Sequence, residues 1–155
     1  MKKYLVLLIL LAAVGCTKTQ TDYTETDHTI IMDYIASHHL TALPALTPQA
    51  TPSGMYYVIE TRGSALKPNY YSTVTVNYTG RLDNDTIFDT TVGRSPAILA
   101  LAQTVVGWQL GVPLIGRGGK IKLLIPSALG YSYQAKGIIP ANSVLIFDIE
   151  LKDFY

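Results

Sequence analysis

The sequence is short of the side chains that most enzymes use for covalent or metal chemistry. Its 155 residues contain one cysteine, Cys16, and three histidines, His28, His38 and His39. Residues 55–155 contain neither type, which excludes a Ser-His or Cys-His nucleophile and the usual zinc ligand sets from that region. Adjacent helical side chains such as those of His38 and His39 diverge by about 100°, so we expect no metal site and no cofactor. A lone cysteine also has no partner in the chain for a disulfide.

Charge is scarce as well. Charged residues make up 15% of the chain, and the formal net charge is +1. A chain with so weak a field does not attract nucleic acid. The Gly-Arg-Gly-Gly sequence at residues 116–119 leads into an expected strand instead of opening a helix, so it does not match a phosphate-binding loop. We expect neither a nucleic acid nor a nucleotide partner.

The one long hydrophobic run lies at the N-terminus, where Lys2 and Lys3 precede apolar residues 4–14. The run is about half the roughly 20 residues that a membrane-spanning helix needs, and a basic start before a short apolar run is typical of a secretory signal. Residues 13–16, Ala-Val-Gly-Cys, resemble a bacterial lipobox, although the lipobox usually has leucine where this chain has Ala13. The resemblance implies a lipoprotein signal peptide over residues 1–15 and lipidation of Cys16. The alternative is an ordinary cleaved signal in which Cys16 has no role.

The next segments predict a tether, a helix and a linker. Residues 16–26 are polar and rich in threonine, as expected of a flexible tether. Residues 27–40 predict an amphipathic helix, with Asp27 as its N-cap and an apolar stripe at Ile31, Tyr34, Ile35 and His38. So short a helix is marginal alone, so it must dock on its own domain or on a second copy of the chain. We therefore expect a monomer or a weak dimer. Residues 41–54 contain three prolines and predict a linker.

The remaining residues, 55–155, have the pattern of strands. Apolar and polar side chains alternate with a period of two over residues 73–78, 120–125 and 145–151. Residues 56–60 and 86–90 predict two further strands. Glycines between residues 107 and 119 limit any helix there to a turn or two. The pattern predicts an antiparallel sheet with one face exposed to water and a single short helix covering the other.

Five segments of this domain carry recognisable motifs in order. They are Val-Thr-Val-Asn-Tyr-Thr-Gly at 74–80, Ile-Phe-Asp at 87–89, Val-Val-Gly-Trp-Gln-Leu-Gly at 105–111, Ile-Pro at 125–126 with Gly-Tyr at 130–131, and Gly-Ile-Ile-Pro at 137–140 followed by Leu-Ile-Phe-Asp-Ile-Glu-Leu at 145–151. Over about residues 55–152 they resemble the FKBP family of peptidyl-prolyl cis-trans isomerases. The resemblance implies an α+β fold, in which a five-stranded antiparallel sheet curls around one short helix. It also implies that residues 55–155 are an isomerase domain that assists the folding of exported proteins.

The resemblance further implies a hydrophobic hollow in which the substrate proline sits on Trp108. The expected walls of the hollow are Tyr78, Phe88, Val105 and Phe147. Its expected rim is formed by Tyr131 and Ile139, and two further residues, Leu99 and Ala97, are expected to contact the substrate beside it. The Val105 N–H and the Tyr131 hydroxyl would hold carbonyl groups of the bound chain, and Asp89 would orient Tyr78. The partners implied are proline-containing polypeptides and macrolide inhibitors.

The lipobox, tether and preceding helix resemble the exported lipoprotein branch of this family in Gram-negative bacteria. That likeness implies an anchor in the cell envelope through lipid on Cys16, with the domain facing the periplasm. Thr17 is not an acidic retention signal, which favours the outer membrane.

Two alternatives stay open. Large aromatic residues such as Trp108 and Phe147 also dominate ordinary cores, so without the ordered motifs they would be assigned to simple packing. Family members often have two aromatic residues after an Arg-x-x-Pro segment, whereas residues 94–100 read Arg-Ser-Pro-Ala-Ile-Leu-Ala. One pocket wall would then be thinner, and the chain could be a chaperone or binding module that uses the same hollow without catalysis.

Overall fold

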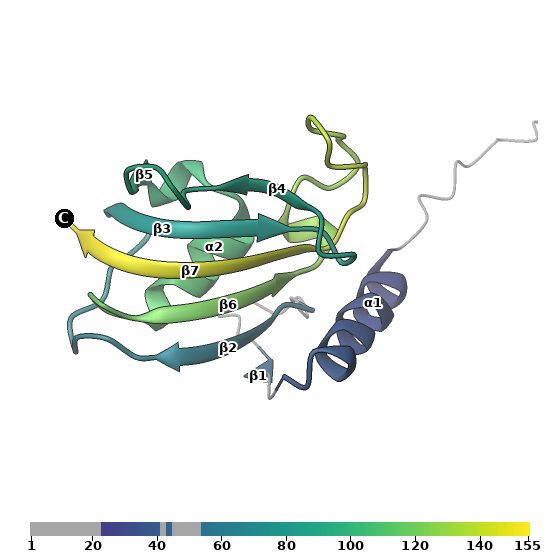
Figure 1. Cartoon of the computed structure of the whole chain (residues 1–155), viewed down its shortest axis with the longest axis horizontal. Coiled ribbons are helices and arrows are strands. Elements are labelled where there is room, and N and C mark those ends of the chain that lie inside the picture. Colours follow the sequence, from purple (N-terminus) through teal and green to yellow (C-terminus); the bar gives the residue numbers. More distant parts are fainter. Residues whose placement is uncertain (1–22, 41–42, 45–53) are drawn as a thin grey trace, which may run out of the picture.

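The structure, a computed structural model, describes residues 23–40, 43–44 and 54–155. The expected signal peptide, Cys16 and most of the tether and the linker lie outside the described residues. The described part contains one antiparallel sheet, a short helix on one of its faces and an N-terminal helix (Figure 1). The predicted α+β class is therefore confirmed.

The sheet has the strand order β1-β2-β6-β7-β3-β4, and β5 also pairs with β3. The strands are β1 (Leu43–Pro44), β2 (Tyr56–Thr61), β3 (Thr73–Arg81), β4 (Ile87–Thr90), β5 (Ala97–Ala100), β6 (Lys120–Ile125) and β7 (Leu145–Phe154). The five predicted strands correspond to β2, β3, β4, β6 and β7. Every pair is antiparallel.

Two short strands were not predicted. Strand β5 pairs with the first half of β3 and β4 pairs with its second half, so the two lie end to end along one edge of β3. Strand β1 is a two-residue edge strand on β2, a place where proline is tolerated because its missing N–H is not needed for the next ladder. The sequence Ala-Ile-Leu-Ala of β5 shows no polar alternation, which is why the period of two did not reveal it.

Helix α2 (Val106–Gly111) covers one face of the sheet and is six residues long, as the glycine content predicted. Its glycines allow a close approach to β6, because a Cβ on Gly107 would lie 2.5 Å from Ile125 and one on Gly111 would lie 2.5 Å from Leu123. The main core lies between this helix and the sheet. Its fully buried side chains include Val74, Val76, Leu101, Ile121, Leu123, Leu145 and Leu151.

Helix α1 (Thr24–Ser37) packs against the opposite face of the sheet, at one end of β6 and β7 (Figure 1). Ile31 and Tyr34 of α1 form a second buried cluster with Leu124 and Ile146. The expectation that one face of the sheet is exposed to water is wrong at this end. Leu124 and Ile146 are apolar residues at positions where the alternation otherwise places polar side chains, and both are 0% exposed. The helix docks on its own domain, one of the two options that the sequence left open.

The helix begins three residues earlier than predicted, so Asp27 is not its N-cap. Tyr23 occupies that position without a side-chain cap, and Asp27 lies buried in the first turn. The Asp27 Oδ2 atom accepts hydrogen bonds from the backbone N–H of Ser127 at 2.8 Å and from its hydroxyl at 2.7 Å. The carboxyl group thus joins α1 to the segment that follows β6 instead of capping its own helix.

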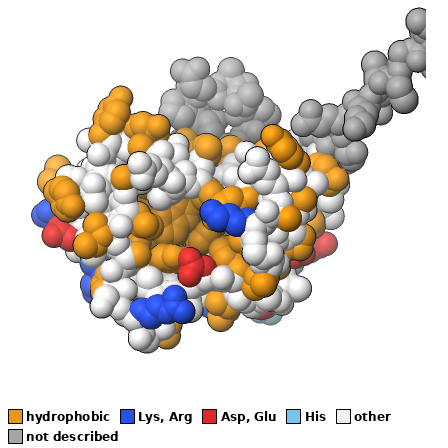
Figure 2. Space-filling view, turned by 90° about the horizontal axis from the view of Figure 1, so that it is seen from above, with side chains coloured by type: hydrophobic (Ala, Val, Ile, Leu, Met, Phe, Trp, Pro, Cys, Tyr) orange, Lys and Arg blue, Asp and Glu red, His pale blue; other side chains and the backbone are white. Residues whose placement is uncertain are grey.

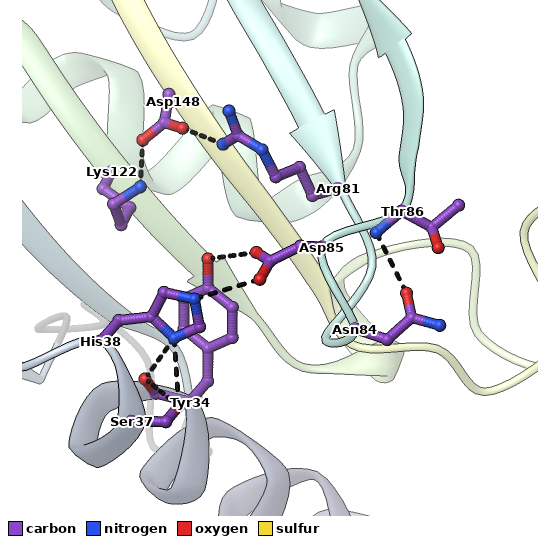
Figure 3. Close-up of polar contacts among 9 residues, drawn as sticks. All are labelled: Tyr34, Ser37, His38, Arg81, Asn84, Asp85, Thr86, Lys122 and Asp148. Atoms are coloured by element: carbon purple, nitrogen blue, oxygen red, sulfur yellow. Dashed lines mark hydrogen bonds and ion pairs between the residues drawn. The ribbon is translucent and has the colours of Figure 1, made fainter.

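A second polar contact fixes the other end of α1 to the β3–β4 turn (Figure 3). The Tyr34 hydroxyl donates to Asp85 Oδ1 at 3.1 Å, and His38 Nε2 lies 3.2 Å from Asp85 Oδ2. The Tyr34 and His38 rings stack at 3.8 Å. Burial, followed by the nearby Asp85 charge, raises the pKa of Tyr34 to about 12, so its hydroxyl keeps the proton that it donates.

Among the described residues, no helix is long and apolar enough to cross a membrane. None of their histidine, cysteine and acidic side chains gathers into a group of three that could hold a metal ion.

Candidate active site

A cavity of about 370 Å³ opens where β3, β4, β5 and β7, the start of α2 and the loop after β6 meet. Figure 2 shows this hollow, with a hydrophobic floor and one basic and one acidic side chain at its edge. The charged residues that line it are Lys136 and Asp89. Its size lies within the range of small-ligand sites, which is about 300–1,000 Å³.

The floor and inner walls of the cavity are an aromatic cluster. The Trp108 ring contacts Tyr78 and Phe147 edge to face, with ring centroids 5.2 Å apart in both pairs. Phe88 packs edge to face on Phe147 at 5.5 Å. Trp108 is 3% exposed and still lines the cavity, as expected of a floor residue. This packing holds each ring in one orientation.

Gly80 in β3 makes room for this cluster. A Cβ at this position would lie 2.5 Å from Phe88 Cε2 and 2.7 Å from Phe147 Cε1. The two phenylalanine rings therefore rest against the bare backbone of β3, and the glycine of the Asn-Tyr-Thr-Gly motif is required by a close approach.

Asp89 and Tyr78 form the polar pair of the cavity. The Tyr78 hydroxyl donates to Asp89 Oδ2 at 2.5 Å, and the Thr90 N–H donates to Asp89 Oδ1 at 2.9 Å. Burial, and then the hydrogen bond to Asp89, raises the pKa of Tyr78 above its ordinary value. The hydroxyl therefore stays protonated at neutral pH and is engaged with Asp89.

Several donors at the cavity have no acceptor among the described residues, the buried indole N–H of Trp108 among them, and two of the others face carbonyl groups in the expected binding mode. One is the backbone N–H of Val105, which precedes α2, and the other is the hydroxyl of Tyr131. The Gln109 side chain of α2 holds the segment before Val105 by donating to the Thr104 carbonyl at 2.8 Å. Lys136 Nζ lies 4.5 Å above the Tyr131 ring. The cavity can thus offer two hydrogen bonds to carbonyl groups of a bound chain.

The structure places nine of the ten residues expected to contact substrate around this cavity. They are Tyr78, Phe88, Asp89, Leu99, Val105, Trp108, Tyr131, Ile139 and Phe147. Ala97 does not line it. Both Ala97 and Leu99 pack against the main core from β5, and only the longer side chain reaches the cavity.

Sequence reasoning missed four residues that line the cavity: Gln103, Thr104, Lys136 and Gly137. Gln103 and Thr104 immediately precede Val105 in the segment before α2, and Lys136 and Gly137 immediately precede the Ile-Ile-Pro segment. Their closeness in sequence to predicted site residues is the one signal that could have found them.

The comparison with protein families decides the assignment. The family described as "FKBP-type peptidyl-prolyl cis-trans isomerase" matches residues 65–152, which include every residue that lines the cavity. The chain belongs to this family. The match begins after β2, so this strand, α1 and the residues before them lie outside it.

Curated relatives and solved structures agree with this assignment. The chain is 44% identical over 104 residues to the FKBP-type isomerase FkpA of Aeromonas hydrophila and 38% identical over 106 residues to FkpA of Escherichia coli K12, covering 66% and 68% of this chain. The crystal structure of FkpA from Escherichia coli matches with a TM-score of 0.70 and 30% identity, covering 84% of this chain and 62% of that one. A peptidyl-prolyl isomerase structure from Pseudomonas syringae matches with a TM-score of 0.65 and 29% identity, covering 84% of this chain and 95% of that one.

The chain spans only 39% of the length of these two curated FkpA proteins. The likeness therefore concerns the FKBP domain and not the whole of either relative.

Proposed function

We propose that this FKBP-family chain is a peptidyl-prolyl cis-trans isomerase that assists the folding of exported proteins. The observation that carries the proposal is the aromatic cavity floored by Trp108, with the free donors of Val105 and Tyr131 beside it. Its size suits a proline ring with its neighbouring peptide groups. The names of the relatives support the same activity.

Isomerisation at such a site needs no acid, base or metal. Rotation about a prolyl peptide bond is opposed by amide resonance, with a barrier of about 18–20 kcal/mol. The planar amide is more dipolar than the twisted one, so transfer from water into an apolar cavity raises the energy of the planar ground state more. Hydrogen bonds to the flanking carbonyls can favour the twisted form. An acceleration of about 10³ to 10⁴ corresponds to roughly 4–5.5 kcal/mol, which burial and a few directed hydrogen bonds can supply.

Each residue has a role in this proposal. Trp108 supports the proline ring, and Tyr78, Phe88 and Phe147 keep water from it. The Val105 N–H and the Tyr131 hydroxyl bind carbonyl groups, and Asp89 holds Tyr78 and faces the substrate. Ile139 covers the rim, and Leu99 forms the wall where many relatives have aromatic residues.

A protease-coupled assay on a Leu-Pro peptide tests the proposal, with Asp89→Val and Trp108→Leu as variants. We expect the wild type to accelerate isomerisation and each variant to lose at least about tenfold in kcat/KM, since each removes contacts made to the rotating amide. A wild type that leaves the spontaneous rate unchanged refutes the enzyme assignment.

A non-catalytic chaperone or binding module is the second candidate. This second function is favoured by the thin wall of the cavity at β5, which contributes only Leu99 to the lining. In that case proline peptides would bind and quench the fluorescence of Trp108, the only tryptophan, without any acceleration. A macrolide of the family's inhibitor type should compete with the peptide under either function, and failure to compete would count against the assigned cavity.

We also propose that the chain is a lipoprotein of the cell envelope, anchored through Cys16 after removal of residues 1–15, with its domain in the periplasm and the outer membrane favoured. The lipobox-like sequence at residues 13–16 and Thr17 support this proposal. Labelling with radioactive palmitate that is blocked by globomycin and lost in Cys16→Ser would support it. Fractionation of inner and outer membranes would then test the location.

Docking of α1 on its own domain favours a monomer over the weak dimer. The apolar stripe of the helix is already covered by Leu124 and Ile146, so it needs no second copy. Sedimentation at micromolar concentration should give a single species at the monomer mass, and a concentration-dependent mass would contradict this.

A further inference from the structure

The buried carboxyl group of Asp27 takes no part in the proposed mechanism, and it lies on a helix outside the family match. Asp27 is 1% exposed, and its Oδ2 accepts hydrogen bonds from both the backbone N–H and the hydroxyl of Ser127, one hundred residues away. Its Oδ1 atom accepts none among the described residues. All of the hydrogen bonding of this buried group is therefore directed at one residue, and burial of an acid is costly unless such bonds are made.

Ser127 in turn organises the segment that carries Tyr131. Its carbonyl oxygen accepts hydrogen bonds from the Gly130 N–H at 3.0 Å and from the Ser132 N–H at 2.9 Å. Both chain neighbours of Tyr131 are thus tied to one carbonyl group. Gly130 is also held against the core, since a Cβ there would lie 2.8 Å from Leu145.

The backbone on either side of Tyr131 therefore has little freedom while Ser127 stays in place. Ser132 has a φ of +54°, a left-handed conformation that a serine adopts only when its surroundings hold it there. The Asn142 N–H donates to the Ser132 carbonyl at 2.7 Å and closes the loop from the other side. A continuous set of hydrogen bonds runs from Asp27 through Ser127 to both sides of Tyr131.

We propose that Asp27 is a positioning residue for Tyr131, through which α1 holds the cavity rim in its binding geometry. The inference rests on the proposed function in that Tyr131 is the group that binds a substrate carbonyl. The helix reaches the site from the opposite face of the sheet and touches none of the cavity. Its Tyr34 and His38 hold the β3–β4 turn at Asp85, two residues before the start of β4, the strand that carries Phe88 and Asp89.

The test compares Asp27→Ala with Asp33→Ala, which removes an exposed carboxylate from the same helix. The kcat/KM on a Leu-Pro peptide is measured at 10 °C, with full folding of each variant verified by circular dichroism. Asp27→Ala should lose about two- to tenfold, the size of one misplaced hydrogen bond, and Asp33→Ala should match the wild type. In a Tyr131→Phe background the additional loss from Asp27→Ala should vanish, because the hydroxyl that it positions is gone. Equal activity of folded Asp27→Ala and wild type, or an undiminished additional loss in the Tyr131→Phe background, overturns the inference.

Asp27→Asn keeps an oxygen that can accept from Ser127, and it should restore most of the activity lost in Asp27→Ala. If Asp27→Ala does not fold, Ser127→Ala removes the hydroxyl bond alone and takes its place in the same cycle with Tyr131→Phe. An additive result in that cycle overturns the inference.

A second measurement separates the inference from the proposed function. In protein labelled with 3-fluorotyrosine, the ¹⁹F resonance of Tyr131 is identified by its loss in Tyr131→Phe. Asp27→Ala should shift or broaden this resonance, and Asp33→Ala should leave it in place. An unchanged Tyr131 resonance in Asp27→Ala overturns the inference even if the wild type is active. A wild type without isomerase activity overturns the proposed function but leaves this readout intact.

Discussion

Tyr78 and Asp89 form a polar pair in a site whose proposed reaction moves no protons. The pKa of Tyr78 is raised, first by burial and then by its hydrogen bond to Asp89, so its hydroxyl remains protonated well above neutral pH. The stabilising contribution of this proton is present below the ordinary tyrosine pKa of about 10 and is lost only as pH rises through the higher folded value. The Tyr78 hydroxyl therefore remains a hydrogen-bond donor throughout the physiological range.

We predict from this that kcat/KM on a proline peptide changes by less than about twofold between pH 6 and pH 9, because no group in the cavity must gain or lose a proton. A conformational assay without a coupling protease measures this, since the protease would add its own pH dependence. A bell-shaped profile in this range would mean that a general acid or base takes part.

Gly80 is the residue at which the aromatic cluster is most easily disturbed. Gly80→Ala would place a methyl group 2.5 Å from Phe88 and should destabilise the protein by about 1–3 kcal/mol and weaken peptide binding as the rings move. Thr75→Ala, in the same strand but away from the cavity, is the control. Urea unfolding and Trp108 fluorescence titration measure the two effects, and wild-type values for Gly80→Ala in both would disprove the close packing.

The resemblance of the motifs to the FKBP family grouped most of the residues that the structure places around the cavity. Trp108, Phe88 and Asp89 fall in short motifs with strict spacing, and the structure places them around one cavity. Lys136 and Thr104 could not be predicted in this way. They line the cavity through loop backbone geometry, which no periodicity encodes.

Among the elements, α1 depends on tertiary packing for its stability. Ile31 is fully buried against the sheet, whereas its neighbour Met32 is 42% exposed. Ile31→Ala should lower the free energy of unfolding by about 2–5 kcal/mol, since it leaves a cavity between α1 and β6. Met32→Ala should change it by less than about 0.5 kcal/mol. Thermal or urea unfolding distinguishes the two, and equal values would show that α1 does not dock as described.

The ion pairs on the α1 side of the sheet link three strands. Asp148 of β7 accepts hydrogen bonds from Lys122 of β6 and from Arg81 of β3 (Figure 3). Burial acts to raise the pKa of Asp148, but the hydrogen bonds and charges of Lys122 and Arg81 outweigh it, and the pKa lies below its ordinary value. The stability that this carboxylate contributes is thus present above the unfolded-state pKa of about 4 and is lost as pH falls through the lower folded value.

Asp148→Asn should therefore make the unfolding free energy less dependent on pH below about 4 than it is in the wild type. Lys122→Met should remove part of the same dependence. Other acids contribute in the same direction, because hydrogen bonds from Asn77 and from the Phe154 N–H lower the pKa values of Glu150 and Asp153. The difference between wild type and variant isolates Asp148, and parallel curves from pH 2 to pH 7 would contradict its role.

Element bounds were less predictable than element types. The long alternating strands were identified from period two, but β5 was not, because its four residues are all apolar. The predicted start of the N-terminal helix lies three residues too late, because an aspartate at this position is typical of an N-cap. The carboxyl group of Asp27 instead accepts hydrogen bonds from Ser127, a residue far away in sequence. Leu124 and Ile146 carried the missing information, since two apolar residues on a polar face indicate a covering element.

The whole molecule combines an FKBP domain with a helix that the family match does not include. The match covers residues 65–152, and α1 ends before it. Alternation and glycine placement predicted an antiparallel sheet with a short helix, and the resemblance of the ordered motifs to the FKBP family implied how the sheet curls around that helix. The docking of α1 did not follow, because a short amphipathic helix fits its own domain or a second copy equally well until the buried surface is known.

In the proposed mechanism the environment of the cavity alone lowers the barrier to rotation about the prolyl bond. Exchange NMR of a Leu-Pro peptide with a small amount of protein, in H₂O and in D₂O, tests it most directly. We predict cis-trans exchange about 10³-fold faster than in the free peptide, nearly equal in the two solvents, and strongly reduced by Trp108→Leu. Exchange at the spontaneous rate, or exchange that slows severalfold in D₂O because a proton moves in the rate-limiting step, would contradict the account.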